Sequence, residues 1–355
     1  MANVLDLRRR IRSVKNTRQI TKAMKMVAAA RLRRAQEKAL SSRPYAMMMT
    51  SVLQSLRRRV DAVDPETGQA HPLLVVRPEK NILLIVVSGE GGFAGAFNAN
   101  IVKAANIFIA ERKDAQIDIE AIGRKGRDVL RRRYPLAQWA DAEKQEERRR
   151  IAPVELLEDH HHGILHKLTF EQVSGLAHEI ISLYAHEKID AAYVVYNEFK
   201  SVIQQRVVVE RVLPVLEIGK REVALAQEMT QEERERAGEA AISSGVTLSE
   251  TEAEADAKQA EEEARRFGTA EVDYIYEQNP GELFNALLPR YVATQLYHAM
   301  LESTAAEFAA RMTAMDSATN NASELIDSLT LAMNRVRQAA ITKELIEIVS
   351  GAAAL

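Results

Sequence analysis

Apolar and small residues recur at alternating steps of four and three through the C-terminal part of the chain, with polar residues between them. This spacing is typical of the seam of a coiled coil. There is no Gly or Pro between Arg290 and Ser350, so helix propensity agrees with the pattern. We therefore predict one helix over residues 282–355, in which the stretch from Arg290 to Ser350 alone is on the order of 90 Å long. Its seam residues are Leu301, Ala305, Phe308, Met312, Met315, Thr319, Ala322, Ile326, Leu329, Met333, Val336 and Ala340.

The N-terminal segment predicts the partner that so long a helix needs. Residues 2–43 lack Gly and Pro, Pro44 does not clearly end the helix, and Asp64–Gly68 does. The segment has thirteen Lys or Arg against two acidic residues, whereas residues 290–350 have five basic and seven acidic residues. This opposite bias favours antiparallel pairing of the two ends. The predicted seam slips once, which would change the local winding: Val4, Leu7, Ile11 and Val14, then Ile20, Met24, Val27, Ala28, Leu32, Ala35 and Ala39.

Between the two ends the periodicity changes to short apolar runs separated by amphipathic segments. Four strands are expected at residues 82–87, 117–122, 191–196 and 202–212, and three helices at residues 98–112, 125–134 and 170–187. Strands that alternate with helices indicate an α/β sheet domain. The predicted organisation is a coiled-coil helix over residues 1–60, a Rossmann-like α/β foot domain over 61–281, and a second coiled-coil helix over 282–355.

An acidic stretch interrupts the α/β pattern. Residues 217–271 hold fifteen acidic and seven basic residues and no Pro. Without an apolar stripe, the stretch predicts a solvated helical excursion or a disordered insert. A dedicated docking or regulatory element is the alternative. Ordered structure is expected again at Val272–Tyr276, before the long helix.

Composition narrows the possible functions. The chain of 355 residues is 46% hydrophobic and has no Cys, which excludes disulfides, thiolate metal sites and thiol catalysis. No run of eighteen apolar residues and no apolar signal core occurs, so any membrane association is expected to come through a partner.

Two segments could form a site for a nucleotide or a metal ion. Gly89-x-Gly91-x-x-Ala94 follows a predicted strand and fits a loose dinucleotide fingerprint, with Asp114 or Asp118 near the acidic position. However, Glu90 would stand where a pyrophosphate must approach, and close packing is the alternative role of this turn. Glu158–His162 with His166 could hold a metal, or could be a polar surface loop. Because no nucleophile motif or carboxylate pair is present, we predict no catalytic residue, no cofactor and no metal.

The two ends are more specific. They resemble the signature ends of the γ subunits of F-type ATP synthases, and further matches occur in the same order along most of the chain. The matching segments are Gln19–Ala29, Gly95–Asn98, Tyr193–Asn197, Arg290–Gln295, Met312–Ala322 and Ile341–Leu355. The turn before Gly95 resembles that of the family only loosely, and the acidic insert lacks the paired Cys of the light-regulated plastid form.

The resemblance implies a central rotor shaft without catalytic activity. In that family an antiparallel coil stands inside a ring of three α and three β subunits, and the foot binds the ε subunit and the c-ring. Such a chain couples ion-driven rotation, as in proton transport, to ATP synthesis or hydrolysis at the β subunits. It would lie at the cytoplasmic side of a bacterial inner membrane, peripheral to the bilayer through the c-ring, and would bind neither nucleotide nor nucleic acid.

The resemblance also implies contact residues. Arg337, Gln338, Thr342 and Glu344 would contact moving loops of the β subunits, although solvated helix positions remain the alternative for Gln338 and Thr342. Met24, with Lys22 and Lys25, would contact an acidic segment of β, although Met24 also fits an intrachain seam. The apolar residues Ile341, Leu345, Ile346, Ile348 and Val349 would form a tip that turns in a bearing.

Two other functional classes remain open from the residues alone. A coiled-coil nucleic-acid binder would use the Arg-rich N-terminal helix and predicts a parallel dimer. An α/β nucleotide enzyme would use the glycine turn and predicts nucleotide binding by the isolated chain.

Overall fold

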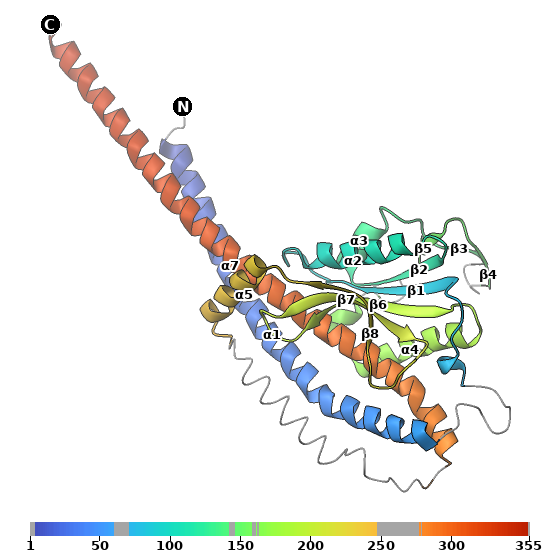
Figure 1. The fold of residues 1–355 in the computed structure, drawn as a ribbon. Coiled ribbons are helices and arrows are strands. Elements are labelled where there is room, and N and C mark those ends of the chain that lie inside the picture. Colours follow the sequence, from blue (N-terminus) through green and yellow to red (C-terminus); the bar gives the residue numbers. More distant parts are fainter. Residues whose placement is uncertain are drawn as a thin grey trace.

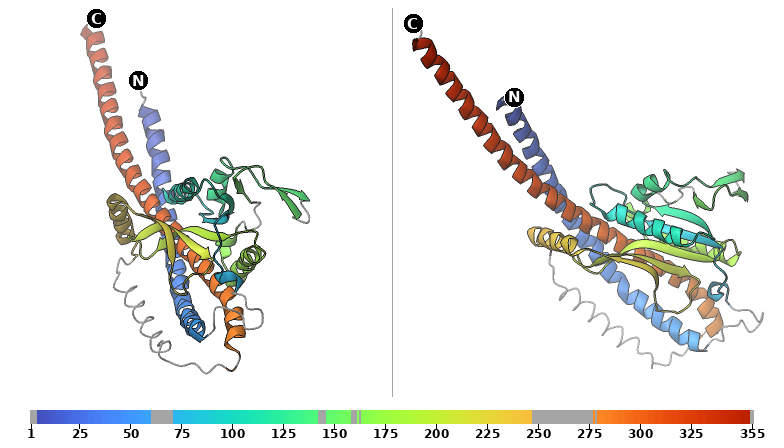
Figure 2. Two further views of the ribbon diagram at one scale, coloured as in Figure 1. Left: turned by 45° about the vertical axis from the view of Figure 1, so that its right-hand side comes forward. Right: turned by 45° about the horizontal axis from the view of Figure 1, so that its top comes forward.

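Two long helices run antiparallel and cross, and an α/β unit packs beside their lower halves (Figure 1). The computed structural model describes residues 4–59, 71–141, 146–157, 161, 163–246, 277 and 279–353. We call the two-helix part that projects from the α/β unit the shaft, and the α/β unit the foot. The shaft holds both chain ends and the foot lies to one side of it in every view (Figure 2).

The two shaft helices confirm the coiled-coil prediction. Helix α1 covers Val4–Arg59 and contains Pro44, and helix α7 covers Pro280–Ala353 and contains Pro289. At 74 residues, α7 is about 110 Å long. Its predicted seam is buried or half-buried from Leu301 to Val336.

The predicted slip in the N-terminal seam is wrong. Ile20 and Val27 are 60% and 54% exposed, whereas Thr21 and Lys25 are only 8% and 7% exposed. The steps of four and three therefore continue without interruption, because polar residues occupy three successive seam positions. The observed seam is Val4, Leu7, Ile11, Val14, Arg18, Thr21, Lys25, Ala28, Leu32 and Ala35.

The foot is built on a six-stranded sheet with the order β5-β2-β1-β6-β7-β8. Strands β1 (Asn81–Val87), β2 (Gln116–Ile122), β5 (Val154–Leu156) and β6 (Ala191–Phe199) run parallel. Strands β7 (Gln205–Leu213) and β8 (Glu222–Glu228) are added antiparallel at one side. The central strand β1 is apolar on both faces because both faces are covered.

Helices cover the two faces of the sheet differently. On one face lie α2 (Phe97–Glu111), α3 (Arg124–Leu130) and the middle of α7. On the other lie α4 (Phe170–Ala185), the start of α7 and the end of α1. Both apolar cores therefore include α7, and the lower part of this helix belongs to the foot. The α/β fold with an antiparallel coil of the two ends is confirmed.

Several short elements were not predicted from the sequence. They are the 3-10 turns η1 (Pro72–Leu74) and η2 (Ile164–Lys167), the strand β5, and the hairpin of β3 (Gln138–Asp141) and β4 (Glu146–Arg149). Helix α3 ends at Leu130, earlier than predicted, and the chain continues in turns up to Pro135.

The acidic stretch also differs from its prediction. Residues 222–228 form the edge strand β8, and Gln231–Ser243 form the helix α5. Thr230 and Glu233 make a capping box at the start of α5, and Ala237, Ala240 and Ala241 are buried. A narrow stripe of Ala buries one side of this helix, and most of its other residues are exposed. The stretch is therefore helical here, as one of the two expected forms, but one side of the helix packs against the rest of the chain. Residues 247–276, which include the predicted return to order at 272–276, lie outside the described residues.

Candidate functional site

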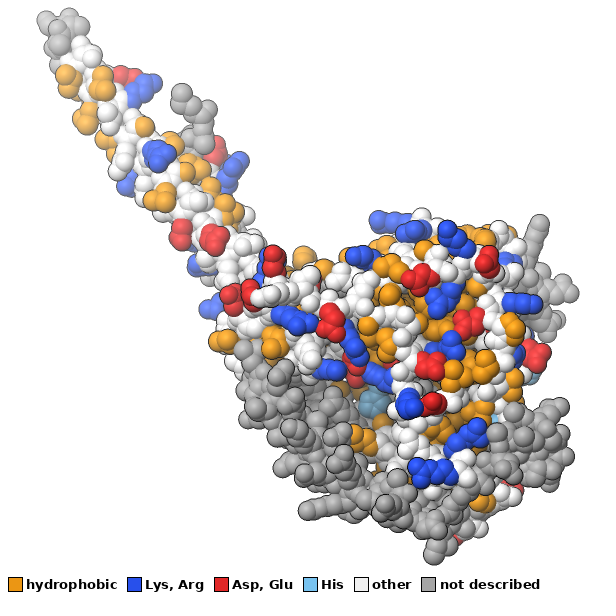
Figure 3. Space-filling view, in the orientation of Figure 1, with side chains coloured by type: hydrophobic (Ala, Val, Ile, Leu, Met, Phe, Trp, Pro, Cys, Tyr) orange, Lys and Arg blue, Asp and Glu red, His pale blue; other side chains and the backbone are white. Residues whose placement is uncertain are grey.

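The upper end of α7 projects beyond the start of α1 (Figure 1). Every residue from Arg337 to Ser350 is exposed, and this part is about 20 Å long. The apolar side chains of Ile346, Ile348 and Val349 are 60%, 67% and 66% exposed. Hydrophobic side chains are visible along this end in Figure 3. A run of exposed apolar residues on a bare helix marks a surface that another molecule covers.

The polar candidates of the C-terminal segment lie on the same bare end. Arg337, Gln338, Thr342 and Glu344 are all exposed. The one described ion pair on this part of the helix is between Lys343 and Glu347, at 3.6 Å. None of these four residues packs against the foot, so all four side chains are available to a partner.

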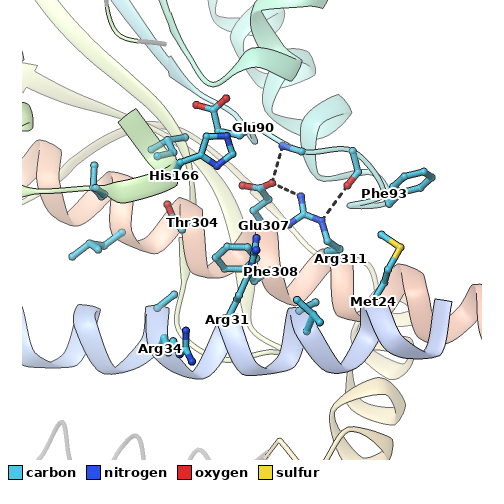
Figure 4. Close-up of a pocket in the computed structure, with 18 of the residues that line it drawn as sticks. Met24, Arg31, Arg34, Glu90, Phe93, His166, Thr304, Glu307, Phe308 and Arg311 are labelled. Atoms are coloured by element: carbon cyan, nitrogen blue, oxygen red, sulfur yellow. Dashed lines mark hydrogen bonds and ion pairs between the residues drawn. The ribbon is translucent and has the colours of Figure 1, made fainter. Parts of the chain in front are cut away.

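A groove opens lower down, where the shaft meets the foot. It has a volume of about 900 Å³ and lies between α1, α7, the glycine turn after β1, and η2. Met24 and the 69% exposed Phe93 lie at one end, and Arg31 and Arg34 line the α1 wall (Figure 4). We call it the basic groove. Its lining residues include Ile20, Met24, Val27, Arg31, Arg34, Lys38, Phe93, His166, Phe308 and Arg311.

The basic groove has an excess of positive charge. Glu307 on its floor pairs with Arg311 one turn later on α7. Glu90 accepts hydrogen bonds from the backbone N–H groups of Arg124, at 3.3 Å, and Gly163, at 3.1 Å. With both acidic groups engaged, the basic side chains from α1 set the potential of the opening, which favours an acidic partner.

The three N-terminal candidates lie in different surroundings. Lys22 is exposed and Met24 is half-buried in the wall of the basic groove. Lys25 is buried, and its Nζ donates to Asp316 Oδ1 at 2.8 Å and to Ser243 Oγ at 3.1 Å. Lys25 therefore does not join Lys22 and Met24 at the surface. The uninterrupted steps of four and three from Val14 to Ala28 were the sequence signal for this burial.

The glycine turn packs against α7. The N–H of Gly91 donates to Glu307 Oε1 at 3.3 Å, and Arg311 Nε donates to the carbonyl oxygen of Gly92 at 3.1 Å (Figure 4). A Cβ on Gly89 would stand 2.8 Å from the carboxyl carbon of Glu307. A side chain at position 89 would displace the Glu307 carboxylate, which lies directly against the turn. The turn therefore supports the close-packing role over nucleotide binding.

The acidic and histidine candidates do not form a ligand site in the described part of the chain. Asp118 is ion-paired with Arg150 at 2.6 Å, and Asp114 is exposed. His161 Nε2 lies 3.2 Å from Glu179 Oε2, and His166 is exposed. Among the described residues no group of three or more His, Cys, Asp or Glu could hold a metal ion. His160 and His162 lie outside these residues.

Burial perturbs two carboxyl groups inside the foot. Burial, and secondarily the charge of Glu179, raises the pKa of Glu120 to about 7. Burial also raises the pKa of Glu210, which accepts a hydrogen bond of 2.7 Å from the Tyr196 hydroxyl. Neither carboxyl faces the basic groove or the bare end. The candidate functional sites are therefore the bare end of α7 and the basic groove.

Comparison with known proteins identifies the family. The model of the ATP synthase family matches residues 3–355. The "ATP synthase gamma chain" of Solibacter usitatus (strain Ellin6076) is 43% identical over 354 residues, which cover 100% of this chain and 99% of that protein. The chain belongs to the ATP synthase gamma chain family. A second gamma chain, from Geobacter sp. (strain M21), is 39% identical over 99% of this chain and 98% of its own length.

One solved structure is also similar to this gamma chain family member. It is the central stalk and c-ring of the Tetrahymena thermophila mitochondrial ATP synthase, with 21% identity and a TM-score of 0.47 over 84% of this chain and 99% of that chain. Among the described residues, no helix is both long and apolar enough to cross a membrane.

The geometry also bears on the nucleic-acid alternative. That hypothesis predicts a coiled coil made by two parallel copies, but here α1 and α7 of a single chain form an antiparallel coil. The Arg-rich helix of this gamma chain family member is therefore already paired, and only its outer side is accessible.

Proposed function

We propose that this chain is the rotating central shaft of ATP synthase. It would couple ion-driven rotation of the c-ring to conformational change, and so to ATP synthesis or hydrolysis, at the catalytic β subunits. The observation that supports this role best is the bare apolar end of α7, which stands on a rigid two-helix shaft in a member of the gamma chain family. The chain itself would catalyse no reaction and bind no cofactor, nucleotide or nucleic acid.

The bare end is suited to rotation. Ile346, Ile348 and Val349 point out from more than one side of the helix and make no directional hydrogen bond through their side chains. An apolar surface attracts an apolar collar without preferring an angle. The free energy of the contact therefore changes little as the helix turns, and the end serves as a bearing.

The polar surfaces are suited to coupling. Arg337, Gln338, Thr342 and Glu344 would contact moving loops of the β subunits, and Lys22 and Met24 would contact an acidic segment of β. The basic groove opens on one side of the shaft, so the described surface is not symmetric about its axis. Because each of three surrounding subunits then meets a different face, the shaft angle favours a different conformation in each one, which is the requirement for coupling.

The foot would make the remaining contacts. We propose that it binds the ε subunit and the c-ring, which would place the chain peripherally at the cytoplasmic side of a bacterial inner membrane. The foot lies at the end of the shaft opposite the bare tip (Figure 2). This arrangement separates the side that receives torque from the side that delivers it.

Single-molecule rotation tests the proposal. Because the chain has no Cys, a single Cys at the exposed Lys113 of the foot gives a specific attachment point for a bead. The chain is assembled with α and β subunits that are fixed to a surface, and ATP is added. We expect unidirectional rotation of the bead in three main steps. A bead that stays at one angle while the assembly hydrolyses ATP would refute the proposal.

Calorimetry tests the nucleotide alternative separately. ATP titrated into the isolated chain should give no heat of binding. Stoichiometric binding would instead favour a nucleotide site at the glycine turn.

A further inference from the structure

Helix α5 packs against α7 at the point where the shaft leaves the foot (Figure 1), and its last residue, Ser243, is hydrogen-bonded to Lys25 of α1. Ala237, Ala240 and Ala241 of α5 are buried in the same apolar core as Leu32 of α1 and Met312 of α7. Their small side chains let α5 approach α7 closely. Side chains of all three helices meet at the neck of the molecule through this core and through hydrogen bonds.

Polar groups from the three helices meet at this contact. Lys25 Nζ of α1 lies 2.8 Å from Asp316 Oδ1 of α7, and Ser243 Oγ of α5 donates to the same carboxylate oxygen at 3.1 Å. Lys25 also donates to Ser243 Oγ at 3.1 Å. The Lys25 and Asp316 side chains are only 9% and 10% exposed. We call Lys25, Ser243 and Asp316 the neck cluster.

Two neighbouring contacts extend the neck cluster along the shaft. Thr319 Oγ1 donates to Thr21 Oγ1 at 2.8 Å, one turn further up. On the other side, the guanidinium of Arg33 in α1 donates to the carbonyl oxygen of Gly245, just after α5. The end of α5 is therefore hydrogen-bonded to α1 through Ser243 and through Gly245, which follows the helix, and to α7 through Ser243.

Net stability does not explain a buried charge pair in a coiled-coil seam. Desolvation largely cancels the attraction between the two charges, and an apolar pair in the same place is usually at least as stable. A buried, hydrogen-bonded pair is directional, because its free energy depends on the distance and angle between the two groups. Such pairs can fix the register of neighbouring helices. The neck cluster therefore sets the relative position of the three helices.

Helix α5 is also continuous with the sheet of the foot. Strand β8 pairs with β7 through Arg206–Arg211, and the capping residue Thr230 follows β8 after one residue. Within the described residues, α1 makes most of its contacts with α7. The lower end of α1 packs in the foot, and α5 connects α1 to the edge of the sheet at the neck as well.

We propose that α5 and the neck cluster brace the shaft against twisting at the neck. Torque applied to the foot would reach α1 and α7 together, with little relative rotation of the shaft and the sheet. Lys25, Ser243 and Asp316 are then positioning residues of the coupling mechanism. This inference rests on the proposed rotary function.

The first test uses the isolated full chain. The variants are Asp316→Asn, the charge exchange Lys25→Asp with Asp316→Lys, and the control Asp327→Asn, at an exposed position of the same helix. Amide hydrogen exchange of α5 is measured relative to that of β1 and β6. We expect the amide hydrogens of α5 to exchange at least about tenfold faster in Asp316→Asn than in wild type, equivalent to about 1.4 kcal/mol. The double variant with swapped charges should restore the slow rate, and the control should keep it. Equal rates in Asp316→Asn and wild type would overturn the inference, as would a charge exchange that restores nothing.

The second test measures torsional stiffness in the assembled complex. The bare end is held in a stalled α and β assembly, and the angular fluctuation of a bead on the foot is recorded. We expect a larger angular variance in Asp316→Asn than in wild type or Asp327→Asn, and a return toward the wild-type value on charge exchange. A purely local stabilising role would change the melting temperature and leave this variance unchanged, which would overturn the inference. If the wild-type complex hydrolyses ATP without rotation, the rotary function itself fails; if it rotates and all variances are equal, only the brace fails.

Discussion

Glu120 gives a prediction about stability whose size follows from the structure. Its side chain lies inside the foot, the residue is 7% exposed, and its Oε1 atom has no hydrogen-bond partner among the described residues. Burial, with a smaller contribution from Glu179 on α4, raises its pKa from 4.5 to about 7. The folded protein therefore holds a proton at this carboxyl at a pH at which the unfolded chain has lost it.

The sign of the effect follows from proton linkage. Between pH 4.5 and about 7 the folded state binds more protons at Glu120 than the unfolded state, so the free energy of unfolding falls as the pH rises through this window. One pKa unit corresponds to about 1.4 kcal/mol, so the rise from 4.5 to about 7 gives a loss of at most about 3.5 kcal/mol, which is nearly complete by about pH 8. A neutral isostere that never ionises should not show this loss.

Urea unfolding of wild type and Glu120→Gln at pH 5 and pH 8 measures the effect. We expect the difference in unfolding free energy to move in favour of Glu120→Gln by about 1 to 3 kcal/mol between the two pH values. Glu171→Gln, at an exposed position of α4, should behave like wild type at both. A difference between wild type and Glu120→Gln that is the same at pH 5 and pH 8 would show that Glu120 is ionised throughout, and the reasoning would be refuted.

Two further predictions concern the shaft. Leu32→Ala removes a side chain that is 0% exposed and should lower the free energy of unfolding by about 2 to 5 kcal/mol; Leu331→Ala, at a 71% exposed position, should stay within about 0.5 kcal/mol of wild type. Equal losses in chemical denaturation would contradict the seam assignment. Removal of the residues after Ala340 should leave the melting temperature of the isolated chain nearly unchanged, because the described part of this segment is exposed up to Ser350, but should reduce torque in the rotation assay. A large fall in melting temperature would mean that the bare end is held by the rest of the chain.

The sequence was sufficient to predict the helices and strands whose surroundings are nearly the same along their whole length. The C-terminal seam could be predicted because a long coiled coil repeats the same packing in every heptad. The same spacing of apolar residues therefore recurs along the helix. Strand β1 was clear because both of its faces are buried, which requires an apolar run. The bare end was also predictable, since a seam cannot continue where no partner helix is present.

The sequence was insufficient where burial depends on which group arrives from elsewhere in the chain. Lys25 looks like a surface residue until Asp316 and Ser243 are brought to it from 291 and 218 residues away, and a polar residue in the seam was therefore mistaken for a slip. Strand β8 looks like part of a charged insert, because Glu222 and Glu228 flank a short run of Val, Ala and Leu. Helix α5 buries only Ala side chains, which give a weak periodic signal.

The chain pattern by itself determined two long helices of opposite charge bias, an α/β unit between them and an apolar end. Only the tertiary structure decided that Lys25 faces inward, that the acidic stretch contains the strand β8 and the helix α5, and that the glycine turn packs on Glu307 and Arg311. Periodicity in the sequence shows which side of a single helix or strand is buried. The pairing of charges depends instead on the distance between helices and strands that lie far apart in the sequence.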